Sequence, residues 1–179
     1  MSSDAWMKVE ELVDQFYSEV LSRAGRTKNR KSNLLYQALI GDASKLSRLE
    51  RLTVTILGRY APRFFAVFFE SASPLEPPFD FYGVLRGGEY WVKAVSGDDA
   101  FNDPTARAVA EASERYPRPM ILTLQGKYFT PRIIGKAVWY PASASWKIVA
   151  GQGAYGRFRD VVYKVAFRYR NRVWKELKS

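Results

Sequence analysis

Two strand-like runs separated by a tight turn constrain the fold of this chain more than any other feature of its sequence. Phe79–Leu85 and Glu89–Val95 are both rich in apolar and aromatic residues, and Arg86-Gly87-Gly88 lies between them. Such a turn between two apolar runs is typical of a β-hairpin. The sequence therefore predicts a pair of antiparallel strands near the middle of the chain.

The segments on either side place this hairpin within a larger sheet. Before it, we expect a helix over about 43–59 and a strand at Phe64–Glu70. After it, Asp103-Pro104 provides a cap and a first-turn proline for a helix that extends to about Tyr116, and Met120–Leu124 predicts a further strand. This order of helix, three strands, helix and strand predicts an α/β fold with a central mixed sheet and helices on both sides.

Additional elements are expected towards both ends of the chain. Apolar residues recur at spacings of three and four in residues 4–22 and 157–177, which predicts a helix in each. A short helix at Leu34–Ile40 and a strand at Ile133–Tyr140 are also expected. Pro141–Gly156 is rich in small residues and is interpreted as a loop.

The length suits a single domain. The chain has 179 residues, of which 47% are apolar, so it can form a core of its own. Within residues 1–179 we expect a helical N-terminal extension over 1–42, a core over about 43–126, and a C-terminal strand and basic helix over 127–179.

Charge and residue types narrow the range of functions. Lys and Arg outnumber Asp and Glu by 28 to 18, which gives a net charge of +10. An excess of this kind is typical of proteins that bind a polyanion such as nucleic acid. The chain has no cysteine and no histidine, which excludes thiolate zinc sites and catalysis by Ser-His-Asp or Cys-His groups. Any metal would be Mg²⁺, Mn²⁺ or Ca²⁺ held by oxygen ligands.

No segment has the pattern of a signal peptide or a membrane span. The chain begins with MSSDAWMKVEELVDQ, which contains no apolar run, and no later run approaches membrane length. We therefore expect a cytoplasmic protein that does not associate with membranes. A basic amphipathic helix on a membrane surface is the alternative, disfavoured by the absence of a lipidation motif.

Two groups of basic residues are candidates for binding a nucleic-acid backbone. One forms a stripe on the final predicted helix, away from its apolar face, and the other lies in the turn-prone stretch after the first helix. The alternative for the stripe is an ordinary solvated helix face. The members are Arg157, Lys164, Arg168 and Lys175 in the stripe, and Arg23, Arg26, Lys28, Arg30 and Lys31 in the second group.

The residues most suited to chemistry lie in and beside the hairpin. Asp80 opens its first strand and Lys93 lies midway along its second. Neighbouring antiparallel strands are about 4.8 Å apart, so these side chains converge if the register is right. Phosphodiester hydrolysis without histidine requires carboxylates that hold a divalent cation, and a lysine can steady the nucleophile or the developing charge. The structural alternative is that Asp80 only accepts hydrogen bonds from backbone donors.

On these residues the sequence resembles the PD-(D/E)XK nuclease superfamily, which includes many type II restriction endonucleases and archaeal junction resolvases. Asp80, in Pro-Phe-Asp, is similar to the first aspartate of the motif, and Lys93, thirteen residues later, to its lysine. The segment from Ser96 to Asn102 resembles one that follows the catalytic lysine in several restriction enzymes, which implies contacts with DNA. Glu50 falls in the helix where many members carry a further metal-binding glutamate; its alternative is a surface glutamate.

One position departs from the motif, because Trp91 stands where the family has its second acid. Glu89 shares a strand face with Trp91 and Lys93, but it lies four residues from Lys93, or about 13 Å along the strand. Glu89 and Asp98 are weaker candidates for the missing acid. The other acids that could supply a ligand are Glu50, Glu70 and Asp99.

The resemblance implies an endodeoxyribonuclease that depends on Mg²⁺ or Mn²⁺ and acts on duplex or branched DNA. In it, Asp80 and Glu50 would hold the metal and Lys93 would position the attacking water. By analogy with double-strand cutters, a homodimer is expected. The alternatives are a nucleic-acid-binding module with a nuclease-like fold and no activity, for DNA or RNA, and an interaction subunit that uses its basic helix for assembly.

Overall fold

The computed structural model describes the backbone of residues 2–23 and 48–178 and the side chains of residues 4–20 and 55–169. The described part contains helices and a six-stranded mixed sheet, so the prediction of an α/β fold is confirmed. The predicted helix at Leu34–Ile40 and most of the basic group that follows the first helix lie outside the described residues. The chain groups into two compact units, one of residues 1–60 and 156–179 and the other of residues 61–155.

The first unit contains α1 (Ser2–Arg23) and α6 (Ala154–Lys178), as predicted, together with most of α3 (Arg48–Ala66). Apolar residues at helical spacing on α1 are buried against the other helices of this unit. The Tyr17 ring stacks on that of Tyr169, with centroids 5.3 Å apart, and so joins α1 to α6.

The second unit contains the sheet, whose strands follow the order β1-β2-β3-β4-β6-β5. Strands β1, β2 and β3 pair antiparallel, β3 pairs parallel with β4 and β4 with β6, and the edge strand β5 pairs antiparallel with β6. The strands are β1 (Ser71–Pro74), β2 (Phe81–Leu85), β3 (Gly88–Val95), β4 (Pro119–Thr123), β5 (Arg132–Ile134) and β6 (Ala137–Trp139).

The predicted hairpin is formed by β2 and β3. Its two turn residues both have positive φ, 48° at Arg86 and 77° at Gly87. That combination is typical of a type I′ turn, whose twist matches that of the flanking strands. Leu85 therefore pairs with Gly88, and this register carries through to the start of β2, where Phe81 lies opposite Val92.

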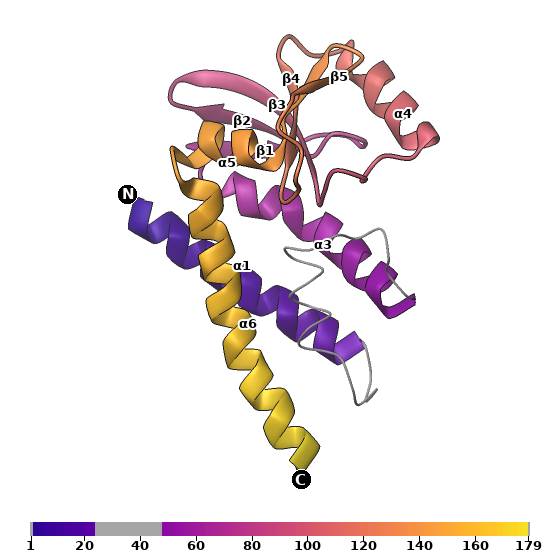
Figure 1. The fold of residues 1–179 in the computed structure, drawn as a ribbon. Coiled ribbons are helices and arrows are strands. Elements are labelled where there is room, and N and C mark those ends of the chain that lie inside the picture. The colour runs from indigo at the N-terminus through magenta and orange to yellow at the C-terminus, as the bar shows by residue number, and fades with distance from the viewer. Residues whose placement is uncertain (1, 24–47, 179) are drawn as a thin grey trace. The chain divides into compact units, whose positions relative to one another are not determined.

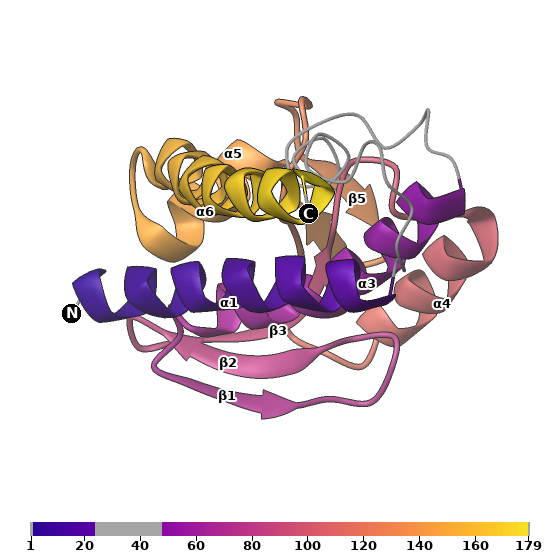
Figure 2. The same ribbon diagram turned by 90° about the horizontal axis from the view of Figure 1, so that it is seen from below.

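The core of the second unit lies on both faces of β4, whose five residues are all buried. Helix α4 (Asp103–Ser113) packs on one face through Val109 and Ala112, which meet Val95 and Ile121. Helix α5 (Ala142–Ala150) lies on the other side of the sheet in both ribbon views (Figure 1, Figure 2).

The prediction of a strand at Phe64–Glu70 is wrong. Helix α3 continues to Ala66, and a turn follows before β1 begins at Ser71. A continuous apolar run has the same periodicity in a buried strand and a buried helix, and Phe64 and Phe65 are both fully buried on α3. The helix predicted over about 43–59 is thus longer at its C-terminal end.

The interpretation of Pro141–Gly156 as a loop is also wrong, because it contains α5 and the start of α6. The buried residues Ala142, Ser145, Trp146 and Val149 recur at spacings of three and one, which places them on one helix face. The indole N–H of Trp146 donates to the backbone oxygen of Leu124, 2.8 Å away, and joins α5 to the end of β4.

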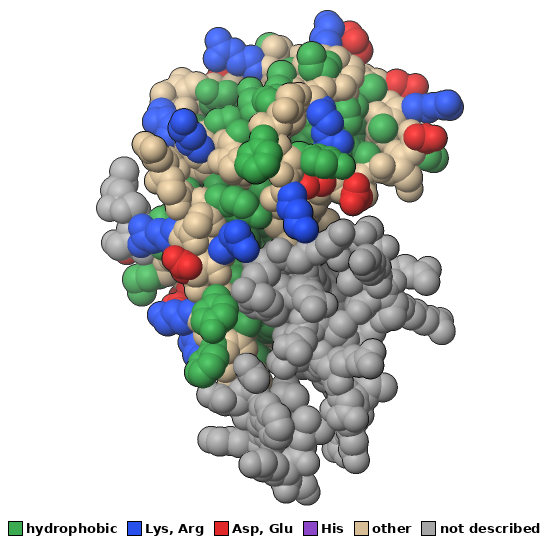
Figure 3. Space-filling model, in the orientation of Figure 1, with side chains coloured by type: hydrophobic (Ala, Val, Ile, Leu, Met, Phe, Trp, Pro, Cys, Tyr) green, Lys and Arg blue, Asp and Glu red, His purple; other side chains and the backbone are tan. Residues whose placement is uncertain are grey.

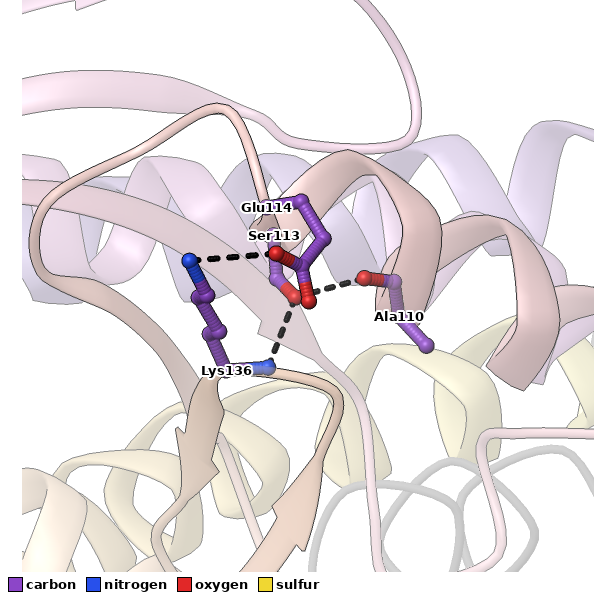
Figure 4. Close-up of polar contacts among 4 residues, drawn as sticks. All are labelled: Ala110, Ser113, Glu114 and Lys136. Atoms are coloured by element: carbon purple, nitrogen blue, oxygen red, sulfur yellow. Dashed lines mark hydrogen bonds and ion pairs between the residues drawn. The ribbon is translucent and has the colours of Figure 1, made fainter.

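The predicted strand at Ile133–Tyr140 is instead a short hairpin of β5 and β6 that is attached to the end of α4. The buried Ser113 hydroxyl donates to the Ala110 oxygen and accepts from the Lys136 N–H, at 2.6 and 2.9 Å (Figure 4). The Lys136 ammonium also lies 3.1 Å from the Glu114 carboxylate (Figure 4). Gly135, with φ of 62°, allows this approach, because a Cβ there would lie 2.5 Å from the Ser113 hydroxyl.

Candidate functional site

Asp80 and Lys93 lie side by side, as their spacing predicts. Asp80 immediately precedes β2, and its N–H donates to the Val92 oxygen of β3 at 2.9 Å. One carboxylate oxygen, Oδ2, accepts from the Ala94 N–H at 2.7 Å and lies 3.7 Å from the Lys93 ammonium. Each side chain is 22% exposed. Asp80 therefore accepts a hydrogen bond from a backbone donor, as expected if its role is structural, and it also pairs with Lys93.

Burial controls the protonation of Asp80. It raises the pKa of this carboxyl above its ordinary value, and the nearby Lys93 ammonium and the Ala94 N–H only partly offset the rise. A carboxyl with a raised pKa beside a lysine is a recurring feature of functional sites, although structural ion pairs can produce it too.

Trp91, which stands where the motif has its second acid, belongs to a cluster of aromatic side chains. The Trp91 ring stacks on Tyr116, at the end of α4, with centroids 6.1 Å apart, and it contacts Tyr82 of β2. Trp91 and Lys93 share a strand face, so this cluster forms an apolar border beside the Asp80–Lys93 pair. The family motif has a carboxylate at this position, and the chain has none.

Two of the other acids that the sequence singled out, Glu89 and Asp98, have hydrogen-bond partners away from the pair. Glu89 accepts from the Tyr82 hydroxyl at 2.6 Å, a bond that raises the pKa of Tyr82. Asp98 lies in the loop after β3, where its Oδ2 accepts from the N–H groups of Lys127 and Tyr128 at 2.7 and 3.3 Å. Glu50 lies on α3, but its side chain is outside the described part of the chain.

The two polar residues expected to contact DNA lie at the end of β3 and at the start of α4, and their contact with DNA stays a prediction. Asn102 caps α4, since its side-chain oxygen accepts from the Thr105 N–H at 2.9 Å. The predicted cap was Asp103, which is instead the first residue of the helix. Ser96 is buried at the end of β3.

The described side chains contain no cluster of potential metal ligands. Among them, no group of three or more Asp, Glu, His or Cys residues could hold a metal ion. Asp80 alone does not make the oxygen-rich site that Mg²⁺ prefers. The involvement of Glu50, whose side chain lies outside the described part of the chain, stays a prediction.

No family model, curated protein or solved structure matches this chain significantly. Its functional assignment therefore rests on its own residues and geometry. Where the chain is described, none of its helices has both the length and the apolar character needed to cross a membrane.

The basic stripe on α6 is partly neutralised by α1. The Glu10 carboxylate lies 2.9 Å from the Lys164 ammonium and 3.2 Å from the Arg168 guanidinium. These two cations hold the pKa of Glu10 below its ordinary value, with the hydrogen bond from Lys164 as the main cause. The Arg157 guanidinium stacks over the Trp6 ring, 4.7 Å from its centroid. Lys175 and Arg23 lie on described helices, but their side chains are not described.

A second basic region was not recognised in the sequence pattern. No Asp or Glu occurs between Glu114 and Asp160, whereas eight Lys or Arg residues do. Three of these cations, Lys127, Arg132 and Lys136, lie near large apolar residues between β4 and β6. Basic and apolar side chains are interspersed over much of the molecular face in Figure 3. The acid-free run of sequence was the signal that could have identified this region.

Proposed function

We propose that this protein is a metal-dependent endonuclease of the restriction-endonuclease-like type that acts on DNA. The observation that carries the proposal is the placement of Asp80 beside Lys93, with 3.7 Å between carboxylate and ammonium. The family motif requires an aspartate and a lysine from neighbouring strands at one point. Two residues thirteen positions apart meet here because the type I′ hairpin fixes their register.

The arrangement of elements supports the proposal. A helix, the antiparallel strands β1, β2 and β3, helix α4 and strand β4 follow one another, in the order that the resemblance implies. Strands β3 and β4 are parallel, and Asp80 and Lys93 lie near the carboxyl end of β3. Ligand sites in open α/β sheets commonly lie beyond the carboxyl ends of parallel strands.

The chain's residues suit defined roles in phosphodiester hydrolysis. Bound Mg²⁺ or Mn²⁺ would supply charge neutralisation at the phosphate and acidify a water molecule. Asp80 and Glu50 are the proposed ligands. Lys93 would hold the attacking water and stabilise the charge that develops on the phosphate.

Cleavage of supercoiled plasmid and of branched DNA, with Mn²⁺ or Mg²⁺ and with chelator, tests this function. We expect cutting that requires the metal, and at least about a hundredfold loss of rate in Asp80→Asn and in Lys93→Ala. The two variants should differ in binding, because Asp80→Asn removes a negative charge from the site and Lys93→Ala removes a positive one. Glu89→Gln is the control, since Glu89 lies away from the pair and should leave cutting intact.

The second candidate is a nucleic-acid-binding module without activity. Trp91 favours it, because this aromatic residue stands where the motif has its second acid and is packed against Tyr116. Strongly salt-dependent DNA binding combined with no cutting of any substrate in any metal would support this candidate against the nuclease.

A further inference from the structure

The loop between β4 and β5 exposes large apolar side chains. We call residues 126–133, which include the first two residues of β5, the aromatic loop. Within it Phe129 is 86% exposed, Ile133 76% and Tyr128 50%. Single exposed apolar residues are common on protein surfaces, but three within six positions form a patch, and such patches commonly mark interaction sites.

The aromatic loop is held in place at its first residues. The Asp98 carboxylate accepts from the N–H groups of Lys127 and Tyr128, and the Tyr155 hydroxyl bonds to both the N–H and the oxygen of Gly126. A Cβ on Gly126 would overlap the Asp98 carboxylate. The exposed rings therefore extend from a fixed base, which lowers the entropy that binding would cost.

The other end of the loop is held as well. The Arg132 guanidinium lies 3.5 Å from the centroid of the Trp139 ring and 4.9 Å from that of Tyr128. It also donates to the Asp98 backbone oxygen at 3.2 Å. Beyond β5, the bonds of Ser113 and Lys136 attach the hairpin to α4 (Figure 4).

The charges around the loop select its partner. Lys127 and Arg132 lie within the loop beside the exposed rings, and the sequence from residue 115 to 159 contains no acid. Lys136 is paired with Glu114 of α4. The Asp98 carboxylate at the base of the loop accepts from backbone N–H groups, and the neighbouring Asp99 is exposed. Aromatic rings among cations fit a polyanion that has flat apolar faces, and nucleic acid is such a ligand. A fully paired duplex hides these faces within its stack, whereas unpaired bases expose them.

We propose that the aromatic loop binds unpaired DNA bases by stacking on Phe129 and Tyr128. This proposal rests on the proposed function and specifies its substrate as DNA with unpaired bases, such as a fork or flap. The loop follows β4, and the Leu124 N–H at its start donates to the Val95 oxygen at the end of β3. The chain that leads into the loop thus leaves the sheet at the carboxyl ends of β3 and β4, the end near which Asp80 and Lys93 meet.

The test is binding of labelled forked and fully paired DNA of equal length, in chelator, so that cutting plays no part. The wild type should bind the fork at least about tenfold more tightly than the duplex, as expected for one or two stacked bases. Phe129→Leu keeps an apolar residue but removes the ring, so it should lose most of this preference. Phe129→Trp should keep it. Neither variant should fold poorly, because Phe129 is almost fully exposed.

A second readout and a matched control make the test specific. Fluorescence of 2-aminopurine in the unpaired arm should be quenched by the wild type and by Phe129→Trp, but not by Phe129→Leu. Phe167→Leu makes the same change at a phenylalanine that is 53% exposed on α6, and it should behave as the wild type.

Three results would overturn the proposal. They are equal binding of fork and duplex by the wild type, wild-type behaviour of Phe129→Leu, and an equal effect of Phe167→Leu. In each case salt-dependent DNA binding or metal-dependent cutting can persist, so the proposed function is judged separately. Failure of the wild type to bind any DNA at low salt would overturn both.

Discussion

At the scale of single residues, Asp80 combines a structural and a chemical role. Its Oδ2 accepts from the N–H of Ala94. Strand β2 begins only at Phe81, opposite Val92, so no residue of β2 is paired with Ala94. The same oxygen lies near Lys93. An aspartate at this point thus completes the end of the strand ladder and also places a carboxylate beside the lysine.

The free energies of unfolding of two Asp80 variants distinguish the structural role from the chemical one. Asp80→Ala leaves the Ala94 N–H without its acceptor, so we expect a loss of about 1–3 kcal/mol in the free energy of unfolding. Asp80→Asn keeps an acceptor in place and removes a charge that burial disfavours, so it should be at least as stable as the wild type at neutral pH. Chemical denaturation of both variants measures the difference.

The pH dependence of this comparison follows from the raised pKa of Asp80. A carboxyl whose pKa is higher in the folded than in the unfolded state gives its full stabilisation at low pH and loses it as the pH rises through the folded pKa. The stability advantage of Asp80→Asn should therefore be largest at neutral pH and shrink on acidification. An advantage that grows on acidification would contradict this account.

The meeting of Asp80 and Lys93 could be predicted from sequence, because strand spacing and the hairpin turn determine it. Their bonding partners could not be predicted in the same way. The bond from Ala94 depends on where β2 begins, and the stacking of Trp91 on Tyr116 depends on how α4 packs on the sheet. Both are tertiary contacts that local pattern does not contain.

At the scale of elements, one buried hydroxyl, that of Ser113, adds hydrogen bonds to the apolar packing that attaches the β5–β6 hairpin to α4. Ser113→Ala removes the bonds to the Ala110 oxygen and from the Lys136 N–H. We expect a loss of about 1–2 kcal/mol in the free energy of unfolding, because the Lys136 N–H loses its acceptor. Thermal unfolding of the variant measures this loss.

Glu114→Gln is the matched control for that experiment. It breaks the ion pair with Lys136 in the same contact, but both side chains are about 60% exposed (59% and 61%). An exposed pair contributes little, so its loss should remain under about 1 kcal/mol. A larger effect for Glu114→Gln than for Ser113→Ala would show that charge, rather than the buried hydroxyl, attaches the hairpin.

Elements with a clear period or turn signal could be predicted, whereas others, such as the end of α3 and helix α5, could not. The β2–β3 hairpin, α1, α4 and α6 follow directly from alternation, caps and helical spacing. The secondary structure of the run that begins at Phe64 was ambiguous, because a continuous apolar run shows neither the period of a helix nor that of a strand. Helix α5 was missed because Ala and Ser in residues 142–145 resemble a loop, although Trp146 and Val149 continue their buried face.

At the scale of the whole molecule, the distribution of charge determines which surfaces are positive enough for the proposed binding of DNA. The +10 net charge could be read directly from composition, but its placement could not. Glu10 pairs with Lys164 and with Arg168, and Arg168 lies 158 residues further along the chain. The α6 stripe is therefore less positive than its own sequence indicates. The sequence between Glu114 and Asp160, which contains no acid, becomes a stronger candidate for binding DNA by comparison.

Glu10 provides a direct test of whether the stripe binds DNA. Glu10→Gln removes the carboxylate that neutralises Lys164 and Arg168, so we expect DNA affinity at low salt to rise several-fold, with a steeper dependence on salt. Stability should fall by less than about 1 kcal/mol, because these side chains are largely exposed. Since the folded-state pKa of Glu10 is lowered, its contribution to stability is present above the ordinary carboxyl pKa and lost as the pH falls through the lowered one.

Glu76→Gln, at an exposed residue between β1 and β2, makes the same change of net charge at a residue with no ion pair to the described side chains of the stripe, and it is the control. If the stripe contacts phosphates, Glu10→Gln should raise affinity more than Glu76→Gln does, because the freed cations lie at the contact. Equal effects would mean that only net charge matters, so that the stripe is a solvated helix face. The region around the aromatic loop would then be the remaining candidate among the described surfaces for binding DNA.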